Sequence, residues 1–133
     1  MAQTLIFRND IMQRLKEASN LAVAVAASGN TTLLTIPVEG LERIFVQFDV
    51  TVNALDAFLI RTRCSKDATT TTLFSTSGAF TTPTGLLVGA SGDLTAQAVG
   101  SGWFIMDVRG LWDVTIQASG NGAATVSIFA GGQ

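Results

Sequence analysis

The alternation of apolar and polar positions is clearest in the middle of the chain. Between residues 43 and 52 every second side chain is apolar: Ile44, Val46, Phe48, Val50 and Val52. A period of two places these side chains on one side of an extended strand and the polar ones on the other. The pattern therefore predicts an antiparallel strand with one buried face.

Further segments of strand character lie between clusters of Gly, Ser, Thr, Asn and Pro. They cover residues 21–27, 31–38, 57–64, 69–75, 86–88, 94–98, 103–108, 111–118 and 123–130. The turn at 53–56 predicts a hairpin between 43–52 and 57–64. Arg109-Gly110 and Asn121-Gly122 predict two more hairpins in the last third of the chain, since Asn-Gly tolerates the positive φ that tight hairpin turns need.

The segments at 86–88 and 94–98 are short strand candidates. The remaining seven or eight short strands, with little helix, predict an all-β fold, a jelly-roll-like antiparallel β-sandwich with a short N-terminal arm or helix. We expect the sandwich to span residues 21–133 and a Thr-rich strand at 69–75 to lie at a sheet edge. The side chains expected to point inward from the C-terminal segments are Phe104, Met106, Val108, Trp112, Val114, Ile116, Val126 and Ile128. With Phe48, they form the predicted core.

The first 20 residues have a different pattern. Asn9 and Asp10 are good helix caps, and the following residues predict a short helix near 10–18. Residues 10–27 fit two interpretations, because apolar positions continue at helical spacing while 22–25 also alternate as a strand. We expect a short helix followed by a strand from about 21 to 27, with residues 1–20 forming the arm.

The composition excludes most catalytic chemistry. The chain has no His and one Cys, so Ser-His-Asp triads, Cys-His dyads and nearly all zinc sites are ruled out. A carboxylate pair is the remaining option, with Asp107 and Asp113 flanking the turn at 109–110. We expect both on a solvent face, with Asp107 beside Arg109. The sequence thus predicts a non-enzymatic protein with no catalytic residue, cofactor or metal.

The single cysteine and the longest apolar run indicate which cellular compartment the protein suits and whether it contacts a membrane. Cys64 is in phase with Phe58 and Ile60, which predicts a buried, inert thiol and a fold that needs no oxidising compartment. The run from Leu21 to Ala27 is too short to span a bilayer, so no membrane contact is expected. It resembles a signal-peptide core, but acidic residues precede it, and we expect an uncleaved product.

The charge pattern argues against nucleic acid as a direct partner. Eight basic residues face ten acidic ones, and only 14% of the chain is charged, against roughly 25% in an ordinary domain. Phosphate binding needs several Lys or Arg on one face. A surface this poor in charge instead suits burial against other protein chains.

Two groups of residues are candidates for a partner interface. Arg61, Arg63 and Lys66 form a small basic group, in which the two arginines share one strand face. Leu5, Ile6, Phe7 and Arg8 form an apolar tip ahead of the sandwich, and an apolar terminus is stabilised by docking on its own domain or on a partner.

Two stretches carry a family resemblance. Residues Gly40–Phe48, continuing through Ala54–Ile60, and residues Ala98–Val114 resemble small structural proteins of the virion modules of tailed bacteriophages and prophages. The size and predicted sandwich also resemble a jelly-roll capsid cement (decoration) protein. The resemblance covers about residues 30–130 and consists of packing and turn patterns.

The resemblance implies a virion structural protein on the outer capsid surface, made in the cytoplasm of the bacterial host. Its partners would be the major capsid protein and further copies of itself, as a homodimer or homotrimer. The alternatives are a tail or head-fibre component and a carbohydrate-binding adhesion module. The last would need an exposed aromatic platform, whereas Tyr is absent and both Trp residues lie in predicted strands.

Overall fold

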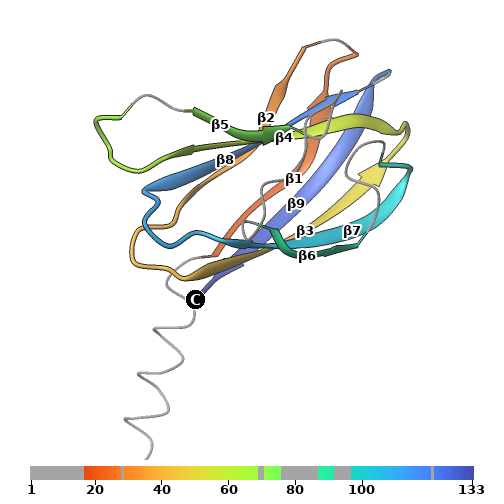
Figure 1. The fold of residues 1–133 in the computed structure, drawn as a ribbon. Helices are drawn as coiled ribbons and strands as arrows, with labels where there is room; N and C mark the ends of the chain where they lie inside the picture. The colour runs from red at the N-terminus through yellow and green to blue at the C-terminus, as the bar shows by residue number, and fades with distance from the viewer. Residues whose placement is uncertain (1–16, 28, 69–70, 76–86, 92–96, 121) are drawn as a thin grey trace, which may run out of the picture.

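The computed structural model describes residues 17–27, 29–68, 71–75, 87–91, 97–120 and 122–133, which form two antiparallel sheets packed face to face (Figure 1). The strands in these ranges are β1 (Glu17–Val25), β2 (Thr31–Pro37), β3 (Arg43–Thr51), β4 (Leu55–Arg63), β5 (Thr71–Ser75), β6 (Leu87–Ser91), β7 (Gly100–Asp107), β8 (Asp113–Gly120) and β9 (Ala124–Gly132). One sheet has the order β1-β9-β3-β7-β6 and the other β2-β8-β4-β5. The predicted all-β sandwich is confirmed.

The strand pairing is that of one long hairpin rolled up on itself. β1 pairs with β9, β2 with β8, β3 with β7 and β4 with β5, all antiparallel. Rolling the hairpin brings β9 beside β3 and β8 beside β4, which completes the two sheets. This nested order is the jelly roll, and β6 adds an outer strand next to β7.

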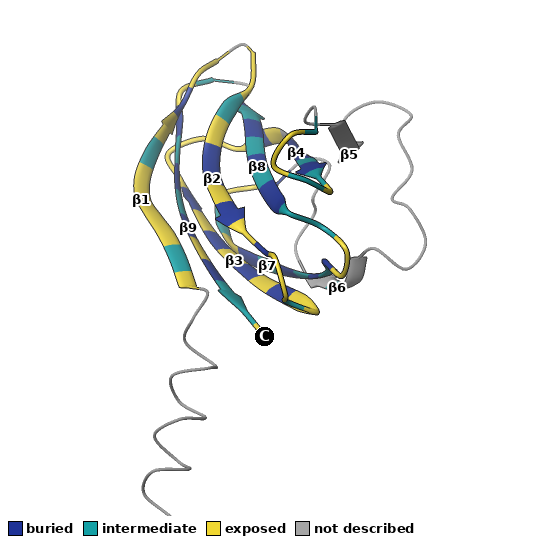
Figure 2. Ribbon diagram, turned by 90° about the vertical axis from the view of Figure 1, so that its left-hand side faces the viewer, coloured by how far each residue is buried: buried dark blue, intermediate teal, exposed yellow. Residues whose placement is uncertain are grey.

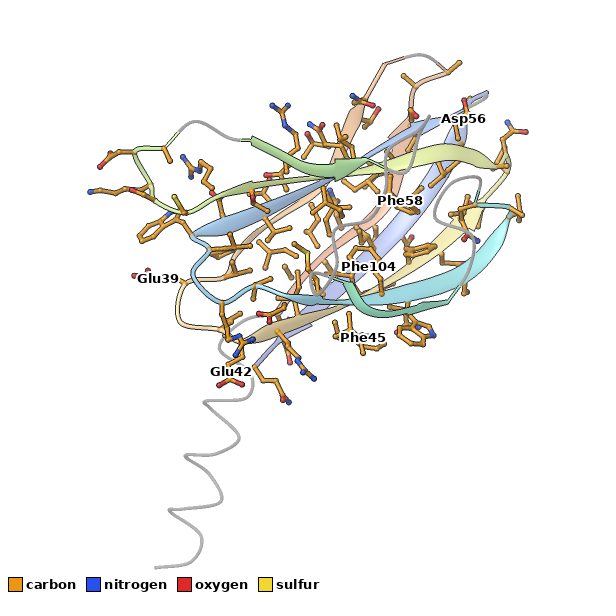
Figure 3. All side chains as sticks on the ribbon, viewed as in Figure 1. Glu39, Glu42, Phe45, Asp56, Phe58 and Phe104 are labelled. Atoms are coloured by element: carbon orange, nitrogen blue, oxygen red, sulfur yellow. The ribbon has the colours of Figure 1, made fainter. Side chains whose placement is uncertain are left out.

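The core lies between the sheets and follows the alternation in the sequence. In β3 the side chains are exposed and buried in strict turn, as the coloured bands of Figure 2 show. Phe48 is fully buried and packs against Phe58 and Phe104, with ring centroids 4.7 and 6.4 Å apart. The rings of Phe58 and Phe104 point into the space between the sheets, whereas Phe45 points away from it (Figure 3). Period two therefore predicted which face of this strand is buried.

The predicted hairpins are wrong. β3 does not pair with β4, β7 does not pair with β8, and β8 does not pair with β9; each of these connections crosses from one sheet to the other. The residues between β3 and β4 begin this crossing at Val52, which has a positive φ of 79° and is 72% exposed. Val52 was expected on the buried side, but the strand has ended before it.

The connections from β2 to β3 and from β7 to β8, which both cross between the sheets, use the same turn. Leu41 donates its backbone N–H to the carbonyl of Val38, and Leu111 donates to that of Val108, at 2.9 and 3.0 Å. The third residue of each turn, Gly40 or Gly110, has φ near +80°, as a type II turn requires. Each turn is also hydrogen-bonded to another segment of the same chain. The Val108 N–H donates to the Glu42 carbonyl, and the Val38 N–H donates to the Trp112 carbonyl. They fix one end of the sandwich.

One open side of the sandwich is bridged by an amide. β1 and β2 are edge strands of different sheets. The Asn20 side chain in β1 donates a 2.9 Å hydrogen bond to the backbone carbonyl of Leu33 in β2. A bulge interrupts the pairing of β1 with β9 between Asn20 and Val23. The edge of β1 is thus irregular, which weakens it as a template for uncontrolled strand addition.

Several local expectations are corrected. Trp112 is only half-buried, because β8 begins one residue later, at Asp113. Cys64 is exposed and not buried, since β4 ends at Arg63 and the alternation stops there. β1 begins at Glu17, four residues before the expected start, so Glu17 and Ala18 are extended and not helical. The rest of the expected helix, and most of the expected strand at 94–98, lie outside the described residues.

Candidate binding surfaces

The outer face of the five-stranded sheet carries an exposed aromatic group. Its members are Phe45 on β3, Trp103 and Ile105 on β7, and Phe129 on β9; we call this set the aromatic face. Phe45 and Phe129 are 43% and 42% exposed, and the other two are half-buried. The rings of Phe45 and Trp103 stack at a centroid distance of 5.7 Å, with 14° between their planes.

The strand register arranges this face in rows. One row runs Glu17, Gly131, Phe45 and Ile105 across β1, β9, β3 and β7. The next runs Ser19, Phe129, Gln47 and Trp103. Residues of the same row and face lie one strand spacing apart, about 4.8 Å. Gln47 therefore sits between Phe129 and Trp103, and a glycine sits between Glu17 and Phe45.

The glycine produces a hollow. A methyl group built on Gly131 would meet no atom within 4 Å, so the space between Glu17 and Phe45 is open. A hollow of about 380 Å³ on one side of Gly131 is lined by Glu17, Arg43, Ile44, Phe45, Ile105, Gly131, Gly132 and Gln133. A second, of about 530 Å³, extends from Glu17 and Gly131 along Phe129. Aromatic rings and charged or amide side chains thus meet around the same opening.

An ion pair lies at the turn end of the same sheet. Asp107 accepts hydrogen bonds from the Nε and Nη2 atoms of Arg109, the latter at 2.6 Å, and from the Arg109 backbone N–H at 3.1 Å. These bonds, the guanidinium ones foremost, lower the pKa of Asp107 to about 2. Asp107 beside Arg109 was expected from the sequence and is confirmed. The pair is open to solvent, with the Arg109 side chain 70% exposed.

The outer face of the four-stranded sheet has a different chemistry. Thr35 and Thr115 face each other across β2 and β8, with their hydroxyl oxygens 3.3 Å apart. The Gln117 amide donates to the Thr32 hydroxyl at 3.0 Å. Hydroxyls and amides therefore replace the aromatic rings of the opposite face. The sandwich presents two faces of unlike polarity.

The predicted basic group lies at one end of this polar face. Arg61 and Arg63 do project from the same side of β4. Both are half-buried, whereas Ile60 and Thr62, which alternate with them along the strand, are buried. Arg63 is already engaged: its Nε binds both carboxylate oxygens of Asp113, at 3.1 and 3.0 Å, and its Nη1 binds the Lys66 carbonyl at 3.0 Å. The hydrogen bond to Asp113 raises the pKa of Arg63.

The three basic residues are therefore not equivalent. Arg61 is half-buried opposite Thr115, and Lys66 is exposed in the turn after β4. Arg63 ties β4 to β8 through Asp113, which is buried and not on a solvent face as expected. Lys66 is the member best placed for a partner. The apolar tip, Leu5 to Arg8, lies outside the described residues.

The two candidate carboxylates occupy separate ion pairs. Asp107 binds Arg109, while Asp113 binds Arg63. Within the described ranges, no three acidic or cysteine side chains converge in the way a metal site needs. Over the same residues, no helix has the length and apolar character of a membrane span.

The aromatic face was missed in the sequence, although its signal was present. Phe45 and Phe129 fall on positions of β3 and β9 where the alternation calls for polar side chains. Trp103 and Ile105 occupy the same outward phase of β7. Large apolar residues in the exposed phase of three strands mark a surface for binding.

Comparisons with known proteins bear on the fold. No model of a protein family matches the sequence, and no curated protein is significantly similar to it. The structure is similar to that of YomS, an SPBc2 prophage-derived protein, with a TM-score of 0.52 and 11% identity over 88% of this chain and 93% of that one. It is also similar to XepA, a PBSX exported protein, with a TM-score of 0.52 and 14% identity over 88% of this chain and 37% of XepA. At these identities the likeness shows the sandwich fold alone.

Proposed function

We propose that this chain is a non-enzymatic structural protein of a tailed-bacteriophage virion, which binds the outside of the capsid and cements neighbouring major capsid subunits. The observation that carries the proposal is the rolled-hairpin sandwich, an architecture used in viral capsid proteins. Its likeness to a protein described as prophage-derived supports a phage origin. The sequence resemblance to virion-module proteins points the same way.

The chemistry of the surface fits a permanent structural role. Only 14% of residues are charged, and two of the acidic ones are neutralised by arginines of the same chain. A surface with little charge left over has little hydration to lose when other chains cover it. The protein would then act mechanically, by adding buried area across the joints between capsid subunits.

Several contacts would act together. We place Lys66, Arg61 and the apolar tip at Leu5–Arg8 in the interface, with Arg63 serving mainly to hold the neighbouring turn through Asp113. A homodimer or homotrimer would touch several capsid subunits at once, so weak individual contacts would give firm attachment. An edge strand such as β2 could also extend a sheet of the capsid by main-chain hydrogen bonds.

The test is to mix the purified protein with mature, empty capsids that lack it, and to follow binding by co-sedimentation and cryo-electron microscopy. We expect density on the outer shell at the joints between capsid subunits. Density on the tail or at the portal would instead identify a tail or head-fibre component. Absence of binding to any part of the virion would overturn the proposal.

The basic residues allow a matched comparison. Lys66→Glu should weaken capsid binding because it reverses an exposed charge in the proposed interface. Arg43→Glu reverses another exposed basic residue, on β3 of the opposite sheet, and should leave capsid binding unchanged. Equal effects of the two changes would show that only net charge matters, and would remove the basic group from the interface.

A further inference from the structure

We propose that the aromatic face holds a carbohydrate site, centred on the hollow beside Gly131, which takes a short β-1,4-linked oligosaccharide of glucose or N-acetylglucosamine. This inference goes beyond the capsid role and uses the sheet opposite the basic group. It rests on the side chains that the strand register places around Gly131, which has no side chain of its own.

The hollow combines two kinds of surface within one strand spacing of each other. The apolar part is the Phe45 ring on β3, with the Phe129 ring of the adjoining hollow diagonal to it, and both rings are more than 40% exposed. The polar part is formed by Glu17 on β1, by Arg43, which is next to Phe45 on the outer face of β3, and by Gln133 after β9. Gly131 forms the floor between them because it has no side chain.

A sugar ring has the same two kinds of surface. Its C–H groups form an apolar face that packs on an aromatic ring, while its hydroxyls donate to carboxylates and accept from guanidinium and amide N–H groups. A small-molecule site is commonly an apolar concavity of 300–1,000 Å³ with a few placed polar groups, and the hollow of about 380 Å³ falls in this range. An apolar protein patch would instead leave Glu17 and Arg43 covered without partners, which is costly.

The linkage follows from the shape of the face. Phe129 and Trp103 lie two strands apart, on either side of Gln47, so the aromatic positions extend across the sheet for about 10 Å, twice the strand spacing. Sugars of glucose configuration carry their ring hydroxyls at the rim, which leaves both faces free for stacking. A β-1,4 linkage keeps successive rings in an extended ribbon that can follow this line of aromatic positions, whereas an α-1,4 linkage curls the chain into a helix that cannot.

The test uses the full-length protein with cellohexaose and chitohexaose as probes, measured by isothermal titration calorimetry, and with maltohexaose as the α-linked control. We expect one or both β-linked probes to bind and maltohexaose to bind at least about tenfold more weakly, which corresponds to about 1.4 kcal/mol. Which of the two β-linked probes binds better distinguishes glucose from N-acetylglucosamine as the ligand.

The decisive variant is Gly131→Leu. It fills the hollow at a position with open space and no left-handed backbone, so the fold should be kept, which circular dichroism and thermal unfolding would verify. We expect at least tenfold weaker binding, and a similar loss for Phe45→Ala. Thr35→Leu places the same leucine on the outer face of the other sheet and serves as the matched control, with binding unchanged.

Three results would overturn the site. These are no binding of either β-linked probe, binding that Gly131→Leu leaves unchanged, and equal binding of maltohexaose.

If size-exclusion chromatography shows a dimer that Phe45→Ala dissociates, the aromatic face belongs to a second copy of the chain. Loss of capsid binding in Gly131→Leu would assign the face to the capsid. Because Lys66→Glu tests the capsid role separately, failure of one proposal leaves the other standing.

Discussion

Phe48 and Trp112 show how far the alternation of the sequence predicts whether a single side chain is buried. Both are large aromatic residues predicted to lie in the core. Phe48 stands in the middle of a regular strand, where alternation is a safe guide, and it is fully buried. Trp112 precedes the first residue of β8 and is half-buried. The prediction that Cys64 is buried is wrong for the same reason, because Cys64 lies one residue after the end of β4. Alternation thus predicts burial within strands and loses its meaning at their ends.

The difference between these aromatic residues is measurable as stability. Phe48→Ala should lower the free energy of unfolding by about 3–5 kcal/mol, because it removes a ring packed between Phe58 and Phe104 and leaves a cavity. Phe129→Ala, at a ring that is 42% exposed, should cost about 1 kcal/mol or less. Urea unfolding of both variants checks this ordering, and equal losses would place Phe129 in a buried contact.

Asp107 gives a second prediction at this scale. Its pKa is lowered from an ordinary 3.8 to about 2, so its ion pair with Arg109 favours the folded state above pH 3.8. That contribution is lost as the pH falls through the folded pKa, toward 2. In a carbon-13 NMR titration the Asp107 carboxyl should have its midpoint near 2 in the wild type and return toward 3.8 in Arg109→Ala. A midpoint that the substitution does not move would assign the shift to another cause.

At the scale of elements, strands are predictable while their partners are not. The expected segments at 31–38, 43–52, 57–64 and 123–130 all correspond to strands, within a few residues. Yet a strand alternates in the same way whichever neighbour it pairs with. β3 and β4 are consecutive in the chain, but both edges of β3 are occupied by β7 and β9. Turn residues describe only the local bend. At 108–111 positive φ is confined to Gly110, which gives a type II turn that suits a sheet crossing, whereas tight hairpins favour types I′ and II′.

β8 ends, just before the crossing to β9, at a glycine with a steric role. A methyl group on Gly120 would lie 2.7 Å from the Gly122 carbonyl oxygen and 3.3 Å from that of Ala26, both backbone atoms. Gly120→Ala should therefore destabilise the fold by about 1–3 kcal/mol through overpacking. Gly131→Ala adds the same methyl group in open space and should change stability by no more than about 0.5 kcal/mol. Guanidinium unfolding of the pair checks this, and equal effects would show that the crossing is free to adjust.

For the whole molecule, the two broad faces divide the proposed tasks. The composition predicted a surface that is poor in charge, but not how the remaining polarity is distributed. Phe45, Trp103 and Phe129 come from three strands that are far apart in sequence, and only the rolled pairing makes them neighbours. A strand-by-strand analysis therefore could not predict the aromatic face, even though each of these residues is a large apolar side chain at an outward position of its strand.

The N-terminal segment provides the prediction at this scale. Deleting residues 1–9 should weaken retention on the capsid and leave the sandwich folded, because the described strands begin at Glu17. The apolar side chains at 5–7 would contribute about 25 cal/mol for each Å² they bury on another chain, less the entropy of ordering them. Thermal unfolding and capsid occupancy of the truncated and full-length proteins separate the outcomes. Unchanged occupancy would remove the segment from the mechanism, and loss of folding would place it in the core.

The pairing of β1 with β9 also determines how the domain responds to tension. Glu17 is opposite Gly131, so a force between residue 17 and the C-terminal end acts on the same end of both strands. The hydrogen bonds between them then open one after another, as in a zip, and not all at once in shear. In single-molecule pulling, anchors at residues 17 and 133 should give a lower unfolding force than anchors at 17 and 123. Tension applied through residue 17 and the C-terminal end would therefore separate β1 from β9 at a lower force than tension applied across the two opposite ends of the pair.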